Sequence, residues 1–303
     1  MKRREFVYKG IQAGILTTAS LTFGNIPNLL ASTPQKYDLV AIKGGEPGSM
    51  FDKAMKSLGG MNAFVKKGDR VVVKPNIGWD VIPERAANTN PVLVKRIVEH
   101  CIESGASEVY VFDHTCDDWK RCYSNSGIER AVKEAGGKIV PGNSERYYQE
   151  VVVEKGKRLK KSKVHELILE CDVFINVPVL KSHSSADLTI SMKNLMGIVW
   201  DRRFWHSNDL HQCIADFTSY RKPDLNVVDA YNIMMKNGPR GVSQSDVYMM
   251  KSQIISTDIV AADAAAAKLF GKEPENIEHI KMASDMNLGE IDLSKLNINR
   301  IIL

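Results

Sequence analysis

Short apolar runs that alternate with segments of helical periodicity constrain the fold of this chain more than any other feature. The runs are rich in Val and Ile and almost continuous in apolarity, which is typical of strands covered on both faces. They lie at residues 37–43, 69–75, 107–113, 171–178, 225–230 and 252–257, with a shorter candidate at 139–142. Helical patterns occupy residues 90–105, 125–136, 210–220 and 258–270. This alternation predicts an α/β fold, a mainly parallel sheet flanked by helices on both faces.

The N-terminal segment has the pattern of a twin-arginine export signal. Arg3 and Arg4 form the arginine pair, Phe6 follows two residues later, and Lys9 completes the basic region. The apolar stretch at 10–24 is short and diluted by Gln, Thr, Ser and Gly, so it is too weak for a stable membrane span.

We therefore expect residues 1–31 to be a twin-arginine signal peptide recognised by the export machinery. Cleavage after Ala31 is plausible, although Leu29 fits the small-residue rule for such sites poorly. Residues 32–303 would then form one α/β domain in a periplasmic or other extracytoplasmic location.

The charge of the chain argues against a nucleic-acid partner. The formal net charge is +5, and a net +3 of this sits in the first ten residues, which leaves only +2 for the remainder. A nucleic-acid-binding protein needs a concentrated basic face. The lysine-rich run at 155–163 is interpreted as a solvated hairpin or the start of a helix.

The five cysteines do not form a recognisable metal or redox motif. There is no CxxC pair and no ferredoxin-type iron–sulfur run. Cys101 and Cys171 lie in apolar contexts typical of small core residues. Cys116 and Cys122 lie in a polar stretch, and whether they pair in an oxidising compartment stays open.

Polar side chains follow most of the predicted strands directly. Lys74 lies near the end of the strand at 69–75, Asp113 ends that at 107–113 and is followed by His114, and Lys181 and His183 follow that at 171–178. Further along, Asp229 lies near the end of the strand at 225–230, the Gly238–Gly241 loop comes later, and Asp258 follows the strand at 252–257. Ligands of open parallel sheets bind outside the carboxyl ends of the strands. The sequence therefore predicts one polar crevice at this edge.

Lysines dominate the predicted crevice. Lys193 falls within an apolar helical pattern, where an ammonium is costly to bury unless it meets an anion or a carboxylate. The alternative is that Lys193 packs its apolar stem against the protein and extends its ammonium into solvent. Lys74, Lys181, Lys193 and Arg240 could together form a cradle for a carboxylate or phosphate group. A histidine beside lysines has a lowered pKa and can act as a base near neutrality, which is the role expected of His183.

A metal site is a second use for the histidines. His183, His206 and His211 lie in a region that also holds Asp201, Asp209 and Asp216, but there is no HExxH motif. A bound metal ion or cofactor thus stays an alternative. Asp258 is a natural N-cap of the Ala-rich helix, and Asp263 within that helix needs a partner if it is buried.

At these residues the chain resembles the "domain of unknown function 362" family over roughly Asp69 to Gly271. The resemblance rests on KPN after a strand, a TNP helix start, NVPVLKSH, a T-x-S-x-KN-x-x-G helix, His-x-x-x-I-x-D, and an Asp followed by GP-x-G. By matching positions it implicates Lys74, Asn76, Lys181, His183, Lys193, Asn194, His211, Asp216, Asp229 and Asp263. Many members carry an iron–sulfur segment, which this chain lacks.

Taken together, the sequence predicts an exported enzyme that acts on a small anionic substrate, a carboxylate or a phosphate, in a crevice lined by lysine and histidine. His183, His211 and Lys193 are the expected catalytic residues. Lys74, Asn76, Lys181, Asn194, Asp229 and Arg240 are expected to bind substrate, with Asp216 and Asp263 in support. The alternative is a non-catalytic protein that binds a ligand or cofactor in the same crevice.

Overall fold

The computed structural model describes residues 37–303, so the export signal expected over residues 1–31 lies outside the described residues. Among the described residues, ten strands form one sheet. These are β1 (Leu39–Lys43), β2 (Arg70–Pro75), β3 (Glu108–Val111), β4 (Lys138–Ile139), β7 (Val173–Val177), β8 (Val179–His183), β9 (Asp187–Thr189), β10 (Leu225–Met234), β11 (Val247–Ser256) and β12 (Ile298–Ile302). A separate hairpin pairs β5 (Tyr148–Val152) with β6 (Lys161–His165).

The helices connect these strands along the chain. They are α1 (Pro47–Ser57), α2 (Pro91–Glu103), α3 (Trp119–Asn125), α4 (Ile128–Glu134), α5 (Glu166–Glu170), α6 (Ser191–Asn194), α7 (Arg202–Ser207), α8 (Leu210–Tyr220), α9 (Ile259–Phe270) and α10 (Glu278–Asp285). Their ends follow the local chemistry that the sequence displays. The Asn90 side chain accepts a hydrogen bond from the Val92 N–H at the start of α2, and Asp258 accepts from Val260 and Ala261 at the start of α9.

The sheet is mixed but mostly parallel, as predicted. Its order is β12-β1-β11-β10-β7-β2-β3-β4, with β8 continuing beside β10 and β9 folded back on β8. Parallel pairs join β10, β7, β2, β3 and β4 in succession, and β12 lies parallel to β1. Antiparallel pairs join β11 to both β1 and β10. The α/β class follows from the parallel crossovers, whose helices cover the sheet.

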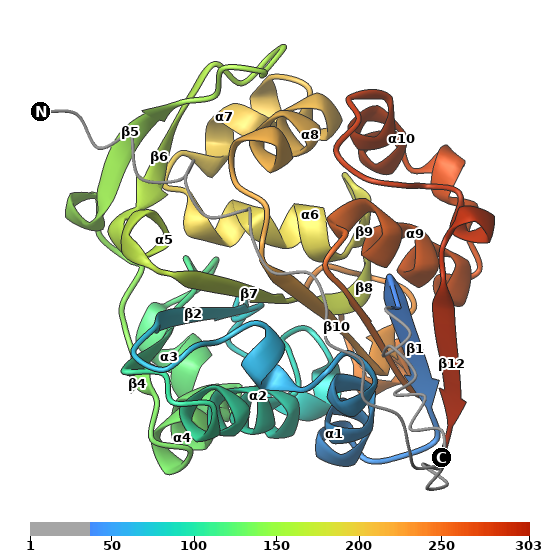
Figure 1. The fold of residues 1–303 in the computed structure, drawn as a ribbon. Helices are drawn as coiled ribbons and strands as arrows, with labels where there is room; N and C mark the ends of the chain where they lie inside the picture. Colours follow the sequence, from blue (N-terminus) through green and yellow to red (C-terminus); the bar gives the residue numbers. More distant parts are fainter. Residues whose placement is uncertain (1–36) are drawn as a thin grey trace, which may run out of the picture. The chain divides into compact units, whose positions relative to one another are not determined.

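Helices cover both faces of this sheet. Figure 1 shows α1, α2 and α4 below the sheet and α6, α8, α9 and α10 above it. Each face has its own apolar cluster. One cluster gathers residues of α1, α2 and α4, such as Phe51, Ile97 and Ile128, and the other gathers residues of α6, α8 and α9. The two clusters explain why the strands between them read as continuous apolar runs.

Two strands differ from the predicted parallel arrangement. Because β11 runs antiparallel to β10, its end pairs with the start of β10, Ser256 opposite Asn226. Asp258 therefore lies at the opposite edge of the sheet from the end of β7. In addition, β10 continues to Met234, so Asp229 lies inside this strand rather than beyond its end. Neither the antiparallel return through residues 235–246 nor the greater length of β10 leaves a mark in a pattern of apolar runs.

The segment after β7 is a second strand rather than an open loop. Pro178 interrupts the chain after Val177, and β8 then carries Lys181 and His183 along the sheet edge. The helical pattern that follows becomes the short α6 and one 3-10 turn, Leu195–Ile198. Within the described part of the chain, every helix is too short or too polar to cross a membrane.

Candidate functional site

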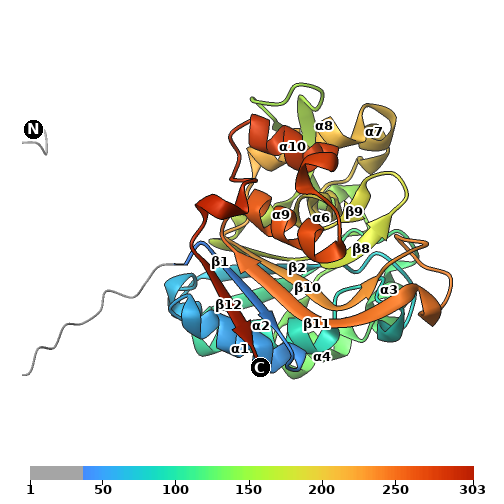
Figure 2. The same ribbon diagram turned by 90° about the vertical axis from the view of Figure 1, so that its right-hand side faces the viewer.

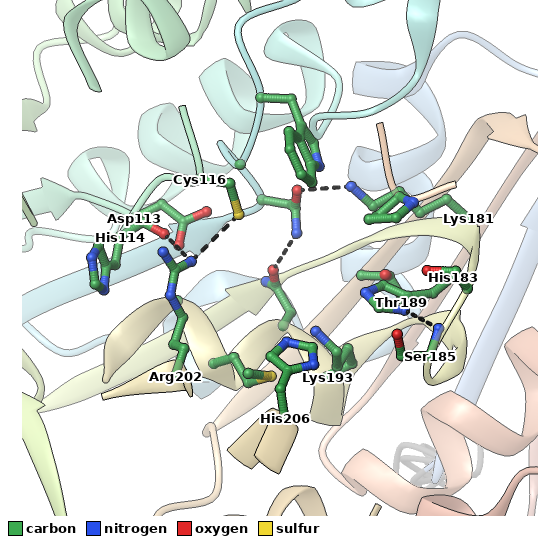
Figure 3. A pocket seen from close by; sticks show the side chains of 18 of the residues that line it. Asp113, His114, Cys116, Lys181, His183, Ser185, Thr189, Lys193, Arg202 and His206 are labelled. Carbon is green, nitrogen blue, oxygen red and sulfur yellow. Dashed lines mark hydrogen bonds between the residues drawn. The ribbon is translucent and has the colours of Figure 1, made fainter. Parts of the chain in front are cut away.

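A cavity of about 450 Å³ opens at the carboxyl ends of β2, β3 and β8, and we call it the central cavity. Figure 3 shows the side chains that surround this cavity, with Asp113 and Arg202 on one side and Lys181 and His183 on the other. Its wall consists of Lys74, Asn76, Gly78, Trp79, Asp113, His114, Cys116, Lys181, His183, Ser184, Ser185, Thr189, Lys193, Asn194, Met196, Gly197, Arg202, Arg203, His206 and Pro239. Five lysine and arginine side chains thus face one carboxylate, that of Asp113.

Lys74 and Asp113 form a buried ion pair in the wall of the cavity. Lys74 Nζ lies 3.0 Å from Asp113 Oδ1, and both side chains are nearly inaccessible to solvent. Burial lowers the pKa of Lys74, and the Asp113 carboxylate opposes this shift. Asp113 Oδ2 also accepts a hydrogen bond of 2.6 Å from the Ile77 N–H, which fixes the carboxylate. The pair is balanced within the protein, so Lys74 is not a free cation for a ligand.

Side-chain amides connect this pair to the next lysine. Asn194 Oδ1 accepts hydrogen bonds from Lys74 Nζ at 2.8 Å and from Asn76 Nδ2 at 3.0 Å. Asn76 Oδ1 in turn accepts from Lys181 Nζ at 3.2 Å. Asn176, on β7, anchors Asn194 through a hydrogen bond of 2.9 Å. The network holds two lysines from different strands in fixed positions.

Lys181 is a buried lysine without a carboxylate partner among residues 37–303. It is 1% exposed, and its Nζ donates to Asn76 Oδ1 and to the Ala87 carbonyl, both neutral acceptors. Burial, together with the nearby Lys193 ammonium, lowers the pKa of Lys181 to about 7. Near neutral pH this side chain is therefore present in both the charged and the neutral form.

Lys193 is the second unpaired lysine of the cavity. Among the described residues its ammonium has no hydrogen-bond or ion-pair partner. Burial and the neighbouring Arg202 lower the pKa of Lys193 to about 8. Thr189 also lines the cavity, and its buried hydroxyl has no hydrogen-bond partner in the described part of the protein. Lysine and hydroxyl donors without acceptors are what an anion would satisfy.

His183 is held in one tautomer by its own loop. Its Nδ1 accepts hydrogen bonds from the N–H groups of Ser185, at 3.0 Å, and Ala186, at 3.1 Å. The proton of the neutral ring therefore sits on Nε2. Burial and the ammonium of Lys193 lower the pKa of His183 to about 2. The ring is thus a neutral N–H donor, and this geometry argues against the general-base role that the sequence suggests.

Arg202, from α7, closes the side of the cavity opposite Lys181. Its guanidinium donates to the carbonyls of His114 and Thr115, both at 2.7 Å, and to Cys116 Sγ at 3.6 Å. His114 Nδ1 lies 2.9 Å from the Val199 carbonyl, and its ring stacks on Trp200. Cys116 and Cys122 are both free thiols, so the structure contains no disulfide between them.

The structure brings six of the predicted site residues together in the central cavity. They are Lys74, Asn76, Lys181, His183, Lys193 and Asn194, from β2, β8 and α6. Asp263 supports them from α9, since its carboxylate accepts hydrogen bonds from the Ser191 N–H at 2.7 Å and the Met192 N–H at 3.0 Å. This contact caps the start of α6, the helix that carries Lys193 and Asn194.

The remaining predicted residues lie outside the cavity wall. Asp229 accepts from the Asn90 N–H at 2.7 Å and so anchors the start of α2. Asp216 accepts from the Arg158 and Leu159 N–H groups and ties α8 to the β5–β6 hairpin. His211 lies at the contact between α8 and α10, where its Nδ1 is 3.2 Å from Nδ1 of His279.

Arg240 lies beside the cavity, where it contacts Asp117 at 3.5 Å and the Trp79 ring. Its neighbour Pro239 contributes to the wall, but Arg240 itself does not.

Sequence reasoning did not select several residues that the structure places in the wall. Asp113 follows a strand and was visible as a polar residue, but its pairing with Lys74 needs the fold. Arg202 and Arg203 come from α7. An arginine pair at the start of a helix does not by itself indicate a functional site. Gly197 is more informative, because the Lys193–Gly197 spacing brings a backbone without a side chain against the ion pair.

No group of three or more His, Cys, Asp and Glu side chains within residues 37–303 is arranged to hold a metal ion. The histidines considered for a metal site are spread over β8, α7 and α8.

Two solved structures have a low similarity to this chain. The lactate racemase apoprotein from Thermoanaerobacterium thermosaccharolyticum is 10% identical, with a TM-score of 0.45 over 83% of this chain and 57% of the other. A protein from Thermotoga maritima is 11% identical, with a TM-score of 0.47 over 80% of this chain and 60% of the other. The chain thus spans less than two thirds of either solved structure.

A curated relative has a higher sequence identity to this chain than either of these structures. A thylakoid-associated protein of Synechocystis sp. is 27% identical over 243 residues, which cover 78% of this chain and 73% of the relative. The family model described as "Domain of unknown function (DUF362)" matches residues 71–268, from β2 to the last turn of α9. The matched segment is well over half of the chain and contains the six gathered residues, so the chain belongs to the DUF362 family.

Proposed function

We propose that the central cavity is the active site of an enzyme that acts on a small anionic substrate, a carboxylate or a phosphate. The observation that carries this proposal is the pair Lys181 and Lys193. Both ammonium groups face a cavity, and no described carboxylate lies within ion-pair distance of either. Burying an ammonium without a counter-charge is costly, and an anionic ligand supplies that charge.

Lys181 and Lys193 would have different roles, because their surroundings differ. No described residue accepts a hydrogen bond from Lys193, so this lysine would hold the anionic group, with the Thr189 hydroxyl as an added donor. Lys181 donates two of its N–H bonds to Asn76 and Ala87. When neutral it keeps a lone pair, and its pKa of about 7 suits a group that takes and returns a proton near neutrality.

His183 complements Lys181 as a donor. Its Nε2–H would stabilise charge that develops on a substrate oxygen, because the ring stays neutral while its Nδ1 accepts from the loop. An acceptor near neutrality and a fixed neutral donor in one cavity favour a proton-transfer enzyme over a protein that only binds its ligand.

The binding step is tested by calorimetric titration with inorganic phosphate and with acetate and lactate. We expect Lys193→Met to weaken the best-bound probe by at least tenfold, since the Met keeps the apolar stem and removes only the charge. Lys53→Met, on the exposed face of α1, is the matched control and should leave the affinity unchanged. Equal affinity for wild type, Lys181→Met and Lys193→Met would remove the basis of the proposal.

The catalytic step is tested by incubating the protein in D₂O with each carboxylate that binds. A proton-transfer enzyme incorporates deuterium into the substrate, which NMR or mass spectrometry detects, whereas a binding protein does not. We expect Lys181→Met and His183→Asn to abolish incorporation. Binding without incorporation for every ligand that binds would favour the non-catalytic alternative.

Export through the twin-arginine machinery is the second part of this proposal. It is supported by Arg3, Arg4, Phe6 and Lys9 in the N-terminal segment. Cell fractionation of the full chain should find the protein outside the cytoplasm, and replacing Arg3 and Arg4 together by Lys should retain it inside. An unchanged distribution would refute the export proposal and leave the cavity proposal untouched.

A further inference from the structure

A second cavity, of about 860 Å³, lies beside the central one between the β5–β6 hairpin and α7, and we call it the hairpin cavity. Figure 1 shows this hairpin next to α7. The two cavities share the side chains of His114, Arg202 and Arg203 in their walls. They are therefore neighbouring compartments separated by three residues rather than independent hollows.

Hydrogen bonds and ring stacking hold Arg202 and His114 of the shared wall in place. Arg202 is held by the carbonyls of His114 and Thr115, each at 2.7 Å. The His114 ring stacks on Trp200 with ring centroids 4.8 Å apart, and Trp200 lines the hairpin cavity. The guanidinium of Arg202 thus stands between the compartments, where it can face an anion from either side.

The hairpin cavity has excess positive charge of its own. Lys161 is paired with Glu150, and Lys163 is paired with Glu145, so these groups balance each other. Arg158 and Arg203 are different, because no carboxylate of the described residues lies within ion-pair distance of their guanidinium groups. Their charges are available to a ligand.

Aromatic surface accompanies these charges. Trp200, Phe204 and Trp205 all line the hairpin cavity. Trp205 is 1% exposed, and its indole N–H is buried without an acceptor in the described part of the structure. An unpartnered buried donor beside aromatic faces suits a ligand with an apolar body and polar groups along it.

We propose that the two cavities form one trough for an elongated dianion, with one anionic group at Lys181 and Lys193 and the other at Arg158 and Arg203. This inference rests on the proposed function and narrows its substrate class. The body of the ligand passes the Arg202 guanidinium and lies against Trp200 and Phe204. An α,ω-dicarboxylate has this chemistry.

The test compares ligands that differ only in the second charge. Octanoate and suberate have chains of equal length, and suberate adds the second carboxylate. At constant ionic strength, calorimetry should show suberate binding the wild-type protein at least tenfold more tightly than octanoate. Arg158→Ala should remove this advantage without changing the affinity for octanoate, and Arg158→Lys should restore part of it.

Two further variants distinguish the possible failures. Lys193→Met should weaken both ligands, and Arg130→Ala, an exposed arginine on α4, should affect neither. If both ligands bind equally well, or if Arg158→Ala leaves the suberate advantage intact, the trough is refuted while the anion cavity stands. If no anion binds the wild type, or if Lys193→Met changes nothing, the proposed function itself fails and the trough falls with it.

Discussion

Gly197 stands where any side chain would collide with the Lys74–Asp113 ion pair. A Cβ atom at this position would lie 1.8 Å from Asp113 Oδ1 and 2.5 Å from Lys74 Nζ. Both groups are buried, so neither can move aside into solvent. We expect Gly197→Ala to lower the free energy of unfolding by about 1–3 kcal/mol or more, measured by urea denaturation.

The control for this change is Gly48→Ala within α1, where an added Cβ meets only ordinary contacts at 3.8 Å. Its stability should be unchanged or slightly higher, because Ala favours a helix over Gly. A Gly197→Ala variant as stable as wild type would mean that the ion pair is not packed as described.

His183 allows its two ring nitrogens to be tested separately. Asn at this position keeps an acceptor near the loop N–H groups of Ser185 and Ala186 but has no donor where Nε2–H lies. We expect His183→Asn to keep most of the stability and lose deuterium incorporation into the substrate. His183→Ala should lose both, with about 0.5–1.5 kcal/mol less stability per lost hydrogen bond. Deuterium incorporation by the Asn variant at the wild-type rate would refute the donor role.

At this scale the sequence identifies charged residues better than it identifies their roles. Lys181 and Lys193 stand out because a lysine beside or within an apolar run demands a partner. The tautomer of His183 depends on two backbone N–H groups in its own loop, and Asp113 becomes important only because it meets Lys74. Such pairings depend on distances across the fold, which local patterns do not contain.

Among the elements, α6 is held in position by a residue distant in the sequence. Its first two N–H groups donate to Asp263 on α9, and that side chain is fully buried. We expect Asp263→Ala to cost about 1–3 kcal/mol of stability, because two buried donors lose their acceptor. The same variant should weaken anion binding although Asp263 is not in the cavity wall, since α6 carries Lys193 and Asn194.

Asp285→Ala serves as the comparison, because Asp285 is an exposed residue of α10 paired with Lys281 on the surface. Its effect on stability should stay within about 0.5 kcal/mol. If Asp263→Ala behaves like Asp285→Ala in both denaturation and titration, the capping contact does not position the helix.

The elements with continuous apolar runs or helical periodicity are predictable from the sequence. Strands β2, β3 and β7 and helix α8 coincide closely with the predicted ranges, because both faces of these strands and one side of the helix are buried. The lysine-rich run at 155–163 lies in the β5–β6 hairpin, so of the two interpretations that the sequence leaves open, a solvated hairpin is confirmed and the start of a helix is wrong. The direction of β11 is set by its hairpin with β10, which no apolar pattern records.

For the molecule as a whole, the unpaired lysines make stability depend on pH. Burial lowers the pKa of Lys181 to about 7, while the pKa of a lysine in an unfolded chain is about 10.4. Between these values the unfolded chain binds more protons than the folded one, so the free energy of unfolding rises with pH. Urea denaturation from pH 6 to pH 10 should show this rise in wild type and a smaller one in Lys181→Met.

Lys53→Met should reproduce the wild-type profile, since that lysine is exposed on α1. Phosphate at saturating concentration should flatten the profile if it binds, because it stabilises the charged lysines and its effect is largest at low pH. A Lys181→Met profile with the full wild-type slope would show that this lysine is not the source.

The place of β1 in the sheet limits when the protein can complete its fold. This strand, the first that the structure describes, pairs on one side with β11 and on the other with β12, near the C-terminal end of the described residues (Figure 2). The ribosome must therefore release the chain as far as residue 302 before β1 acquires both neighbours. Pairings so distant in sequence slow folding, and the nascent chain has to be kept from aggregating until β12 has been synthesised.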